Sequence, residues 1–238
     1  MGRSATLLLL ADSRFPTGAH AHSAGVEASH ARGDVRSVAD LEAFLDGRLL
    51  TTAPVEAAFA AAACAAGACA NSSCANSSGN STTALADLDH ELAIRTPSPR
   101  LRSISRTLGR QLVRPAERAW PASGYDVLRA VHPDGPMQPL AIGVVAAAAG
   151  LSPVDAALCS LHHLVGVVTT AAVRLLGLDP FDVHALAARL APRLDALADE
   201  AARRAVSCAP SDLPAHTSVL ADILAEHHAT WEVRLFAS

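Results

Sequence analysis

The last residues of the chain carry chemistry suited to recognition. Residues 234–238 read Arg-Leu-Phe-Ala-Ser, so one guanidinium precedes two large apolar side chains. A guanidinium can bind a carboxylate through two hydrogen bonds, while leucine and phenylalanine supply apolar contact area. The pattern predicts a partner-binding tail over residues 231–238, with contacts from Arg234, Leu235, Phe236 and Ser238. The alternative is that Leu235 and Phe236 only attach the last helix to the core of the chain itself.

A second group of polar residues lies near the amino terminus. Pro16 and Gly18 form a turn signal, and His20, His22 and Glu27 follow it. Two histidines at this spacing point about 200° apart on a helix, so they could share one metal ion only in an extended segment. Small residues between them permit close backbone approach, and we therefore expect contact with a neighbouring helix or another chain.

A third group precedes the tail. Asp222 and His228 are separated by about 600° of helical rotation, so they do not share a helix face. This spacing argues against a catalytic dyad formed by these two residues.

A metal-dependent helical enzyme is the alternative function. Its ligands would be the scattered histidines together with one carboxylate: His20, His22, Glu27, His162, His163 and His228. Helical bundles build such centres from Glu-x-x-His pairs, and none of these five histidines follows a glutamate at that spacing. Metal bound by the protein itself is therefore the less favoured interpretation.

Composition excludes several classes of protein. All nineteen basic residues are arginine, so there is no lysine for a P-loop, a Schiff base or a lysine general base. A net charge of −4 gives no overall attraction to nucleic acid. The five cysteines form no C-x-x-C pair, which favours free thiols in a reducing compartment.

The elements that must position these groups are helices. Helix-start signals precede apolar runs of helical period at Ser37, Ser98-Pro99, Ser152-Pro153 and Asp179-Pro180, and Gly177 is a stop signal. No alternating strand pattern stands out, so we predict an all-α, irregular bundle of about eight to ten helices in a single domain over residues 1–238. Proline at positions 54, 139 and 192 is expected to break or kink helices. Residues from about 70 to 83 are rich in serine, asparagine and threonine, which predicts a flexible loop.

The apolar segments do not indicate export or a membrane span. Leu7 to Leu10 are too few for a signal peptide, and the apolar stretch over residues 156–178 contains His162, His163 and Arg174. We expect a cytoplasmic protein in which this stretch is a buried helix.

The two terminal groups together resemble the UreF family of urease accessory proteins. The family's amino-terminal signature is similar to Pro16-x-Gly18, His20, His22-Ser23 and Gly25-Val26-Glu27. Its carboxyl-terminal signature is similar to Asp222-Ile223, His228 and residues 234–238. Two internal segments also resemble family helices, Arg106-x-x-Gly109 and the apolar run that starts at Gly143. The chain departs from the family at His20, where an aromatic residue is common, and at Gln138-Pro139, where His-Pro is common.

The resemblance implies a non-catalytic assembly factor. Members of the family dimerise, bind UreD (also called UreH) and recruit the GTPase UreG, so that nickel reaches apo-urease. Nickel would then be the cargo, GTP would be bound by the partner, and the chain itself would hold no tight cofactor. The resemblance places the partner-binding surface on the tail, on Asp222 and His228, and on the amino-terminal residues His20, His22, Ser23, Gly25 and Glu27.

Overall fold

A computed structural model describes residues 3–12, 14–16, 18, 21–71 and 77–236 of the chain. Within these ranges there are eleven α-helices, one short 3-10 helix and no strand, which confirms the predicted all-α class. The helices are α1 (Arg3–Ala11), α2 (Val26–Arg32), α3 (Val38–Leu50), α4 (Thr52–Ala70), α5 (Ser77–Ile94), α6 (Pro99–Ala119), α7 (Gly124–Ala130), α8 (Gln138–Ala148), α9 (Pro153–Leu176), α10 (Pro180–Ser207), the 3-10 helix η2 (Pro210–Asp212) and α11 (Val219–Ala229).

Four helices begin where the sequence predicts, at side chains that accept a hydrogen bond from the first turn. These N-caps are Ser37 for α3, Ser98 for α6, Ser152 for α9 and Asp179 for α10. Asp40 and Asp155 complete capping boxes by accepting from the backbone N–H groups of Ser37 and Ser152. Gly177 ends α9 with φ +65°, a left-handed conformation that favours glycine.

The predicted loop over residues 70–83 begins near the predicted position but is wrong at its carboxyl-terminal end. Ala70 is the last residue of α4, and α5 begins at Ser77, while residues 72–76 lie outside the described part of the chain. Leu85, Leu88 and Leu92 of α5 are buried. Their tertiary packing stabilises the helix, and this contribution outweighs the low helix propensity of the polar residues in its first turns.

Contrary to the prediction, none of the three prolines breaks the helix that contains it. Pro54 lies in the first turn of α4 and Pro139 in the first turn of α8, where a backbone N–H has no partner in any helix. Pro192 lies inside α10, which continues unbroken from Pro180 to Ser207. The neighbouring Leu190 and Leu194 are buried, so packing along that side holds the helix together across the proline.

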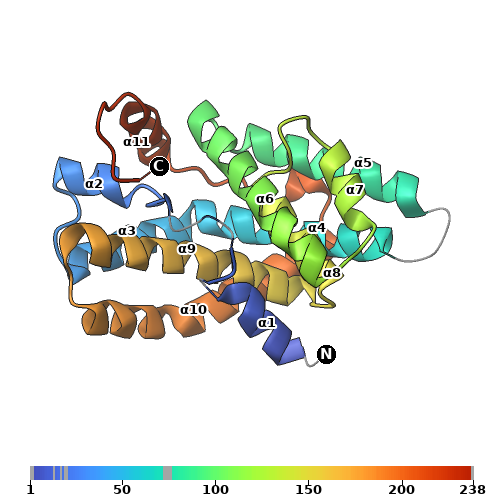
Figure 1. The fold of residues 1–238 in the computed structure, drawn as a ribbon, viewed down its shortest axis with the longest axis horizontal. Helices are drawn as coiled ribbons and strands as arrows, with labels where there is room; N and C mark the ends of the chain where they lie inside the picture. The colour runs from blue at the N-terminus through green and yellow to red at the C-terminus, as the bar shows by residue number, and fades with distance from the viewer. Residues whose placement is uncertain (1–2, 13, 17, 19–20, 72–76, 237–238) are drawn as a thin grey trace.

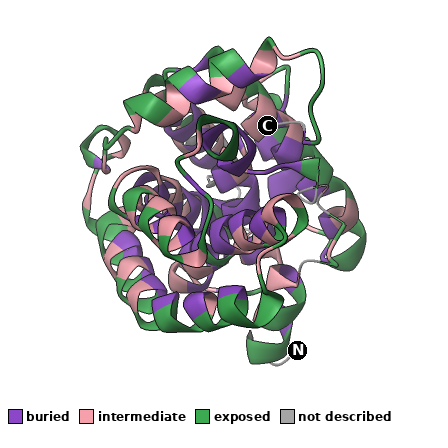
Figure 2. Ribbon diagram, turned by 90° about the vertical axis from the view of Figure 1, so that its left-hand side faces the viewer, coloured by how far each residue is buried: buried purple, intermediate pink, exposed green. Residues whose placement is uncertain are grey.

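Helix α4 runs through the middle of the molecule and packs against α5, α8, α9 and α10 (Figure 1). A Cβ at Gly143 of α8 would lie 2.3 Å from the carbonyl oxygen of Ala60, so only glycine allows this approach of α8 to α4. Buried residues line the inner sides of the helices and exposed ones the outer sides (Figure 2). Alanine and glycine therefore bring the central helices close together.

Two helices, α4 and α9, are long and apolar enough to span a membrane by length and composition alone. In their most apolar windows, 67% and 56% of the residues are buried inside the bundle. The other helices therefore cover most of the apolar surface that makes these two resemble membrane spans.

The Arg106-x-x-Gly109 segment holds α6 against its neighbours. The buried Arg106 guanidinium donates to both carboxylate oxygens of Asp89 at 3.0 and 2.7 Å, and to the carbonyl of Gly135 at 2.7 Å. A Cβ at Gly109 would lie 2.2 Å from the carbonyl oxygen of Pro136. The segment therefore fixes α6, α5 and the chain that leads into α8 relative to one another.

Helix α11 lies at the edge of the bundle. It packs against α2 and α6, and the end of the chain returns beside it (Figure 1). Only Leu224 and His228 of this helix are buried, whereas Val219 and Ile223 are 66% and 59% exposed. The helix is thus attached along one narrow side.

Candidate functional site: the meeting point of the two chain ends

The amino-terminal segment turns sharply into α2. Ala24 and Gly25 have φ values of +52° and +93°, and the N–H of Val26 donates to the carbonyl of Ser23 at 3.1 Å. Two consecutive left-handed residues reverse the chain, and glycine adopts this conformation without strain. As a result Ser23 and Glu27 both face inward and are buried.

Upstream of this turn, Gly18 also has a left-handed backbone. Gly18 has φ +73° and its carbonyl accepts the N–H of Ala21 at 3.1 Å. A Cβ at Gly18 would lie 2.2 Å from Oε1 of Gln111. Pro16 is exposed, and His20 lies outside the described residues.

The Glu27 carboxylate joins the two ends of the chain. Its Oε2 accepts from Nε2 of His228 at 2.9 Å and from the backbone N–H of Phe236 at 3.1 Å. Its Oε1 accepts from the backbone N–H of Leu235 at 2.8 Å. Three donors therefore satisfy a buried carboxylate, which would otherwise be costly to remove from water.

This arrangement separates the roles of the tail residues. Phe236 is buried, and the guanidinium of Arg174 lies over its ring, 5.0 Å from the centroid, as in a cation–π contact. Leu235 is 74% exposed, and Arg234 is also exposed. The alternative role predicted for the apolar pair therefore holds for Phe236 but not for Leu235. Ser238 lies outside the described residues.

Two carboxylates attach α11 to the start of α6. Glu226 accepts from the Ser98 hydroxyl at 2.5 Å and from the N–H of Arg100 at 2.9 Å, and the first of these bonds lowers the pKa of Glu226. Asp222 accepts from the N–H of Ser98 at 3.4 Å, and burial raises its pKa. Both carboxylates lie at a helix amino terminus, where negative charge is favourable.

The described residues of the alternative metal site are not brought together at one point. Glu27 pairs with His228, while His163 accepts or donates a hydrogen bond with Gln138 at 2.9 Å and His162 is exposed. Burial first, then His162 and His22, lower the pKa of His163 to about 4. Among the described residues, no three histidine, cysteine, aspartate or glutamate side chains are grouped so that they could hold a metal ion.

The four described cysteines are free thiols. Burial raises the pKa values of Cys64 and Cys159 to about 12, so both remain neutral. A neutral buried thiol is a poor nucleophile and a poor metal ligand. Cys74 lies outside the described residues.

Two cavities lie beneath α11. The larger has a volume of about 470 Å³ and is lined by Phe44 of α3, Leu101 of α6 and Leu224 of α11, among others. The smaller, of about 150 Å³, is lined in part by His163 and Asp222, and Arg48 borders both cavities. Helix α11 thus lies over two cavities that its side chains do not fill.

Sequence reasoning missed two arginines that organise this region. Arg174 supports Phe236 from the end of α9, and Arg95 holds the segment between α10 and α11 from the end of α5. Neither lies in a local pattern that distinguishes it from the other seventeen arginines. Their partners are distant in the chain, so only the folded structure identifies them.

The chain is similar to known proteins along nearly its whole length. The UreF family profile matches residues 35–191. The urease accessory protein UreF of Mycobacterium sp. (strain JLS) is 42% identical over 234 residues, which cover 98% of both chains. The proteins of the same name from Mycolicibacterium vanbaalenii and Mycobacterium tuberculosis are 40% and 39% identical over 100% and 98% of each chain. The chain therefore belongs to the UreF family of urease accessory proteins and has an accessory rather than an enzymatic role in urease maturation.

Proposed function

We propose that this protein is the adaptor of a urease maturation complex in the cytoplasm, where it binds UreD (UreH) and recruits the GTPase UreG. Nickel is the cargo that the complex delivers to apo-urease, and GTP is bound and hydrolysed by the partner. The protein itself contributes surface and geometry, in keeping with a chain that has no lysine for a P-loop.

The observation that carries the proposal is the ordering of the tail by Glu27. Because Glu27 binds two consecutive backbone N–H groups, the tail is held with Arg234 and Leu235 outward and Phe236 inward. A guanidinium and a leucine on an ordered loop can bind a partner with less loss of conformational entropy than a free peptide. The buried residues Ser23, Glu27 and His228 support this surface instead of contacting the partner.

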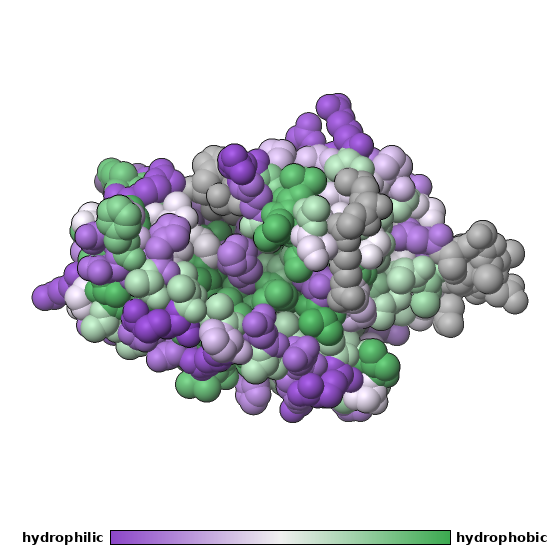
Figure 3. Space-filling model, turned by 90° about the horizontal axis from the view of Figure 1, so that it is seen from below, coloured by the Kyte–Doolittle hydropathy of each residue, from purple (hydrophilic) through white to green (hydrophobic). Residues whose placement is uncertain are grey.

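The homodimer expected for the family is also part of the proposal. On the face seen from below in Figure 3, hydrophobic residues gather near the middle among hydrophilic ones. Leu8 and Leu9 of α1 are exposed, at 72% and 49%. Exposed apolar area of this kind is typical of surfaces that meet another chain.

The test is co-expression of the protein with UreD and UreG from its own organism, followed by size-exclusion chromatography with light scattering. Arg234→Ala should lower the affinity of the complex for UreG about tenfold to hundredfold, because an interface arginine on an ordered loop is a typical hot spot. The matched control is Arg203→Ala, which removes an exposed arginine of α10 that pairs only locally with Glu200.

Two results would count against the proposal. Absence of any complex with the intact protein would remove the adaptor role, and equal UreG binding by the Arg234 and Arg203 variants would remove the role of the tail.

A further inference from the structure

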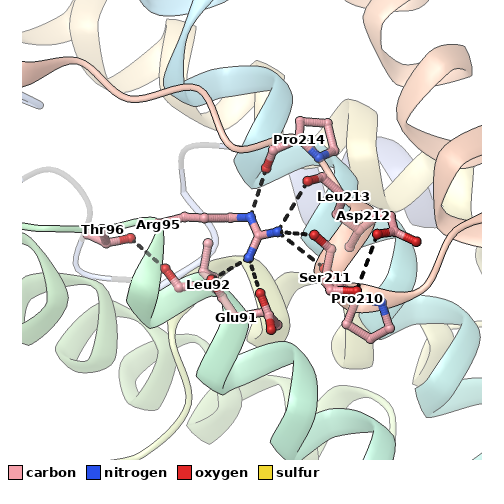
Figure 4. A network of polar contacts seen from close by, with 9 residues as sticks. All are labelled: Glu91, Leu92, Arg95, Thr96, Pro210, Ser211, Asp212, Leu213 and Pro214. Carbon is pink, nitrogen blue, oxygen red and sulfur yellow. Dashed lines mark hydrogen bonds and ion pairs between the residues drawn. The ribbon is translucent and has the colours of Figure 1, made fainter.

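The guanidinium of Arg95, at the end of α5, binds a segment more than a hundred residues away in the chain. Its Nε donates to the carbonyl of Pro214 at 3.1 Å, and its Nη2 donates to the carbonyls of Ser211 at 2.7 Å and Leu213 at 3.3 Å (Figure 4). Its Nη1 donates to the carbonyl of Glu91 at 2.9 Å and to the Glu91 carboxylate. All three nitrogens of the guanidinium thus donate hydrogen bonds: Nε and Nη2 bind the distant segment, and Nη1 binds Glu91.

The Arg95 guanidinium is shielded from solvent. The side chain of Arg95 is 7% exposed, and its guanidinium lies over the ring of the fully buried Phe59, 5.4 Å from the centroid. Hydrogen bonds from a charged donor in a shielded site are stronger than neutral hydrogen bonds on the surface. The group is therefore fixed by the core helix α4 on one side and binds backbone on the other.

The segment that Arg95 binds has few other attachments. Residues 209–217 lie between α10 and α11, and Leu213 is their one buried residue. From this segment the chain enters α11, which is itself attached along a narrow side, and then the tail. The position of residues 219–236, which we call the docking module, therefore depends on this segment as well as on the contacts of Glu27, Asp222 and Glu226 described above.

Lysine could not replace this arginine. An ammonium presents its donors from one point, whereas the planar guanidinium spans carbonyls on successive residues of a turn.

We propose that Arg95 is a positioning residue for the docking module: by binding the carbonyls of Ser211, Leu213 and Pro214, it holds α11 and the tail in the orientation that a partner protein binds. This inference rests on the proposed function, because it assigns a further residue to the same partner-binding surface. Arg95 acts through the module and does not itself contact the partner.

The first test is hydrogen–deuterium exchange of the full-length protein. In Arg95→Met, which keeps an apolar stem over Phe59, the amides of residues 211–229 should exchange at least about tenfold faster, while those of α4 and α8 are unchanged. Arg95→Lys should behave like Arg95→Met, and it provides a second variant that retains the charge if the methionine variant fails to fold.

The matched control is Glu91→Gln, which removes the charge that pairs with Arg95 but leaves the carbonyl contacts in place. It should exchange like the unmodified protein. Unchanged exchange in both Arg95 variants, or equal acceleration in α4 and α8, would overturn the proposal, because Arg95 would then have no specific effect on the module.

The second test measures partner affinity for the same variants. If the partner binds only molecules in which the module is positioned, a variant with fewer such molecules should bind more weakly. Its dissociation constant should rise in inverse proportion to the fraction of molecules with a positioned module. Full affinity in a variant with a released module would overturn the inference while the proposed function stood. Failure of the unmodified protein to bind any partner would instead remove the proposed function, while the exchange result would still show whether Arg95 positions the module.

Discussion

At the scale of single residues, Glu27 is the group on which the site depends. Both of its oxygens accept hydrogen bonds, from one histidine side chain and two backbone N–H groups. An ionised carboxylate suits this environment because it presents only acceptors. The same atoms thus fix the position of α11 through His228 and the direction of the tail.

We therefore predict a measurable cost for Glu27→Gln, although the side chain keeps its size. The amide places N–H donors beside other donors, so at least one buried polar group loses its partner, and the free energy of unfolding should fall by about 1–3 kcal/mol. Urea denaturation measures the fall, and exchange of the tail amides should accelerate. Glu232→Gln, an exposed change in the same tail, is the control; a similar effect there would contradict the special role of Glu27.

At the scale of elements, the packing of α8 on α4 depends on the absence of one side chain. At Gly143 a Cβ would lie 2.3 Å from the Ala60 carbonyl oxygen and 2.7 Å from the Ala63 Cβ. These atoms belong to the backbone or to the shortest side chain, so no rotamer change can relieve the overlap. The two helices would have to move apart.

Gly143→Ala should lower the free energy of unfolding by about 1–3 kcal/mol, with a matching fall in the melting temperature. Gly166→Ala in α9 is the control, because a Cβ there meets nothing within 4 Å. Alanine in an open helical position should raise stability by about 0.5–1 kcal/mol. Equal stability of the two variants in thermal unfolding would show that α8 can shift without cost.

At the scale of the whole molecule, His163 makes the stability of the fold depend on pH. Its pKa is about 4 in the folded protein and 6.5 in an ordinary environment, so the unfolded chain binds more protons between these values. The free energy of unfolding should therefore fall as the pH is lowered from about 6.5 to 4. The side chain is half-buried, so we expect a contribution of about 1–3 kcal/mol.

Urea denaturation across this pH range, on the unmodified protein and on His163→Gln, isolates the effect. The difference in unfolding free energy between the two should change with pH below about 6.5 and stay constant above it. His90→Gln, at an exposed histidine of α5, should run parallel to the unmodified protein. A constant difference between the His163 variant and the unmodified protein across the range would contradict the lowered pKa.

The sequence by itself determined the helical class, the starts of four helices and the family. These features are local: an N-cap such as Ser37 satisfies backbone donors a few residues ahead, and Gly177 stops α9 by its own conformation. The two terminal motifs could likewise be identified from the sequence, because the residues of each motif lie close together along the chain. The extent of the loop near residue 77 and the tolerance of Pro192 could not, because packing against other helices decides them.

Only the tertiary structure decided how the site is assembled. Glu27 and His228 are 201 residues apart, and no periodicity within either segment indicates that they meet. Leu235 is exposed and Phe236 is buried because the backbone hydrogen bonds to Glu27 orient the first side chain outward and the second toward Arg174. Arg95 is a further case, since its acceptors are backbone carbonyls that any sequence provides. Contacts of this kind depend on the path of the whole chain, and the path is set by the packed core.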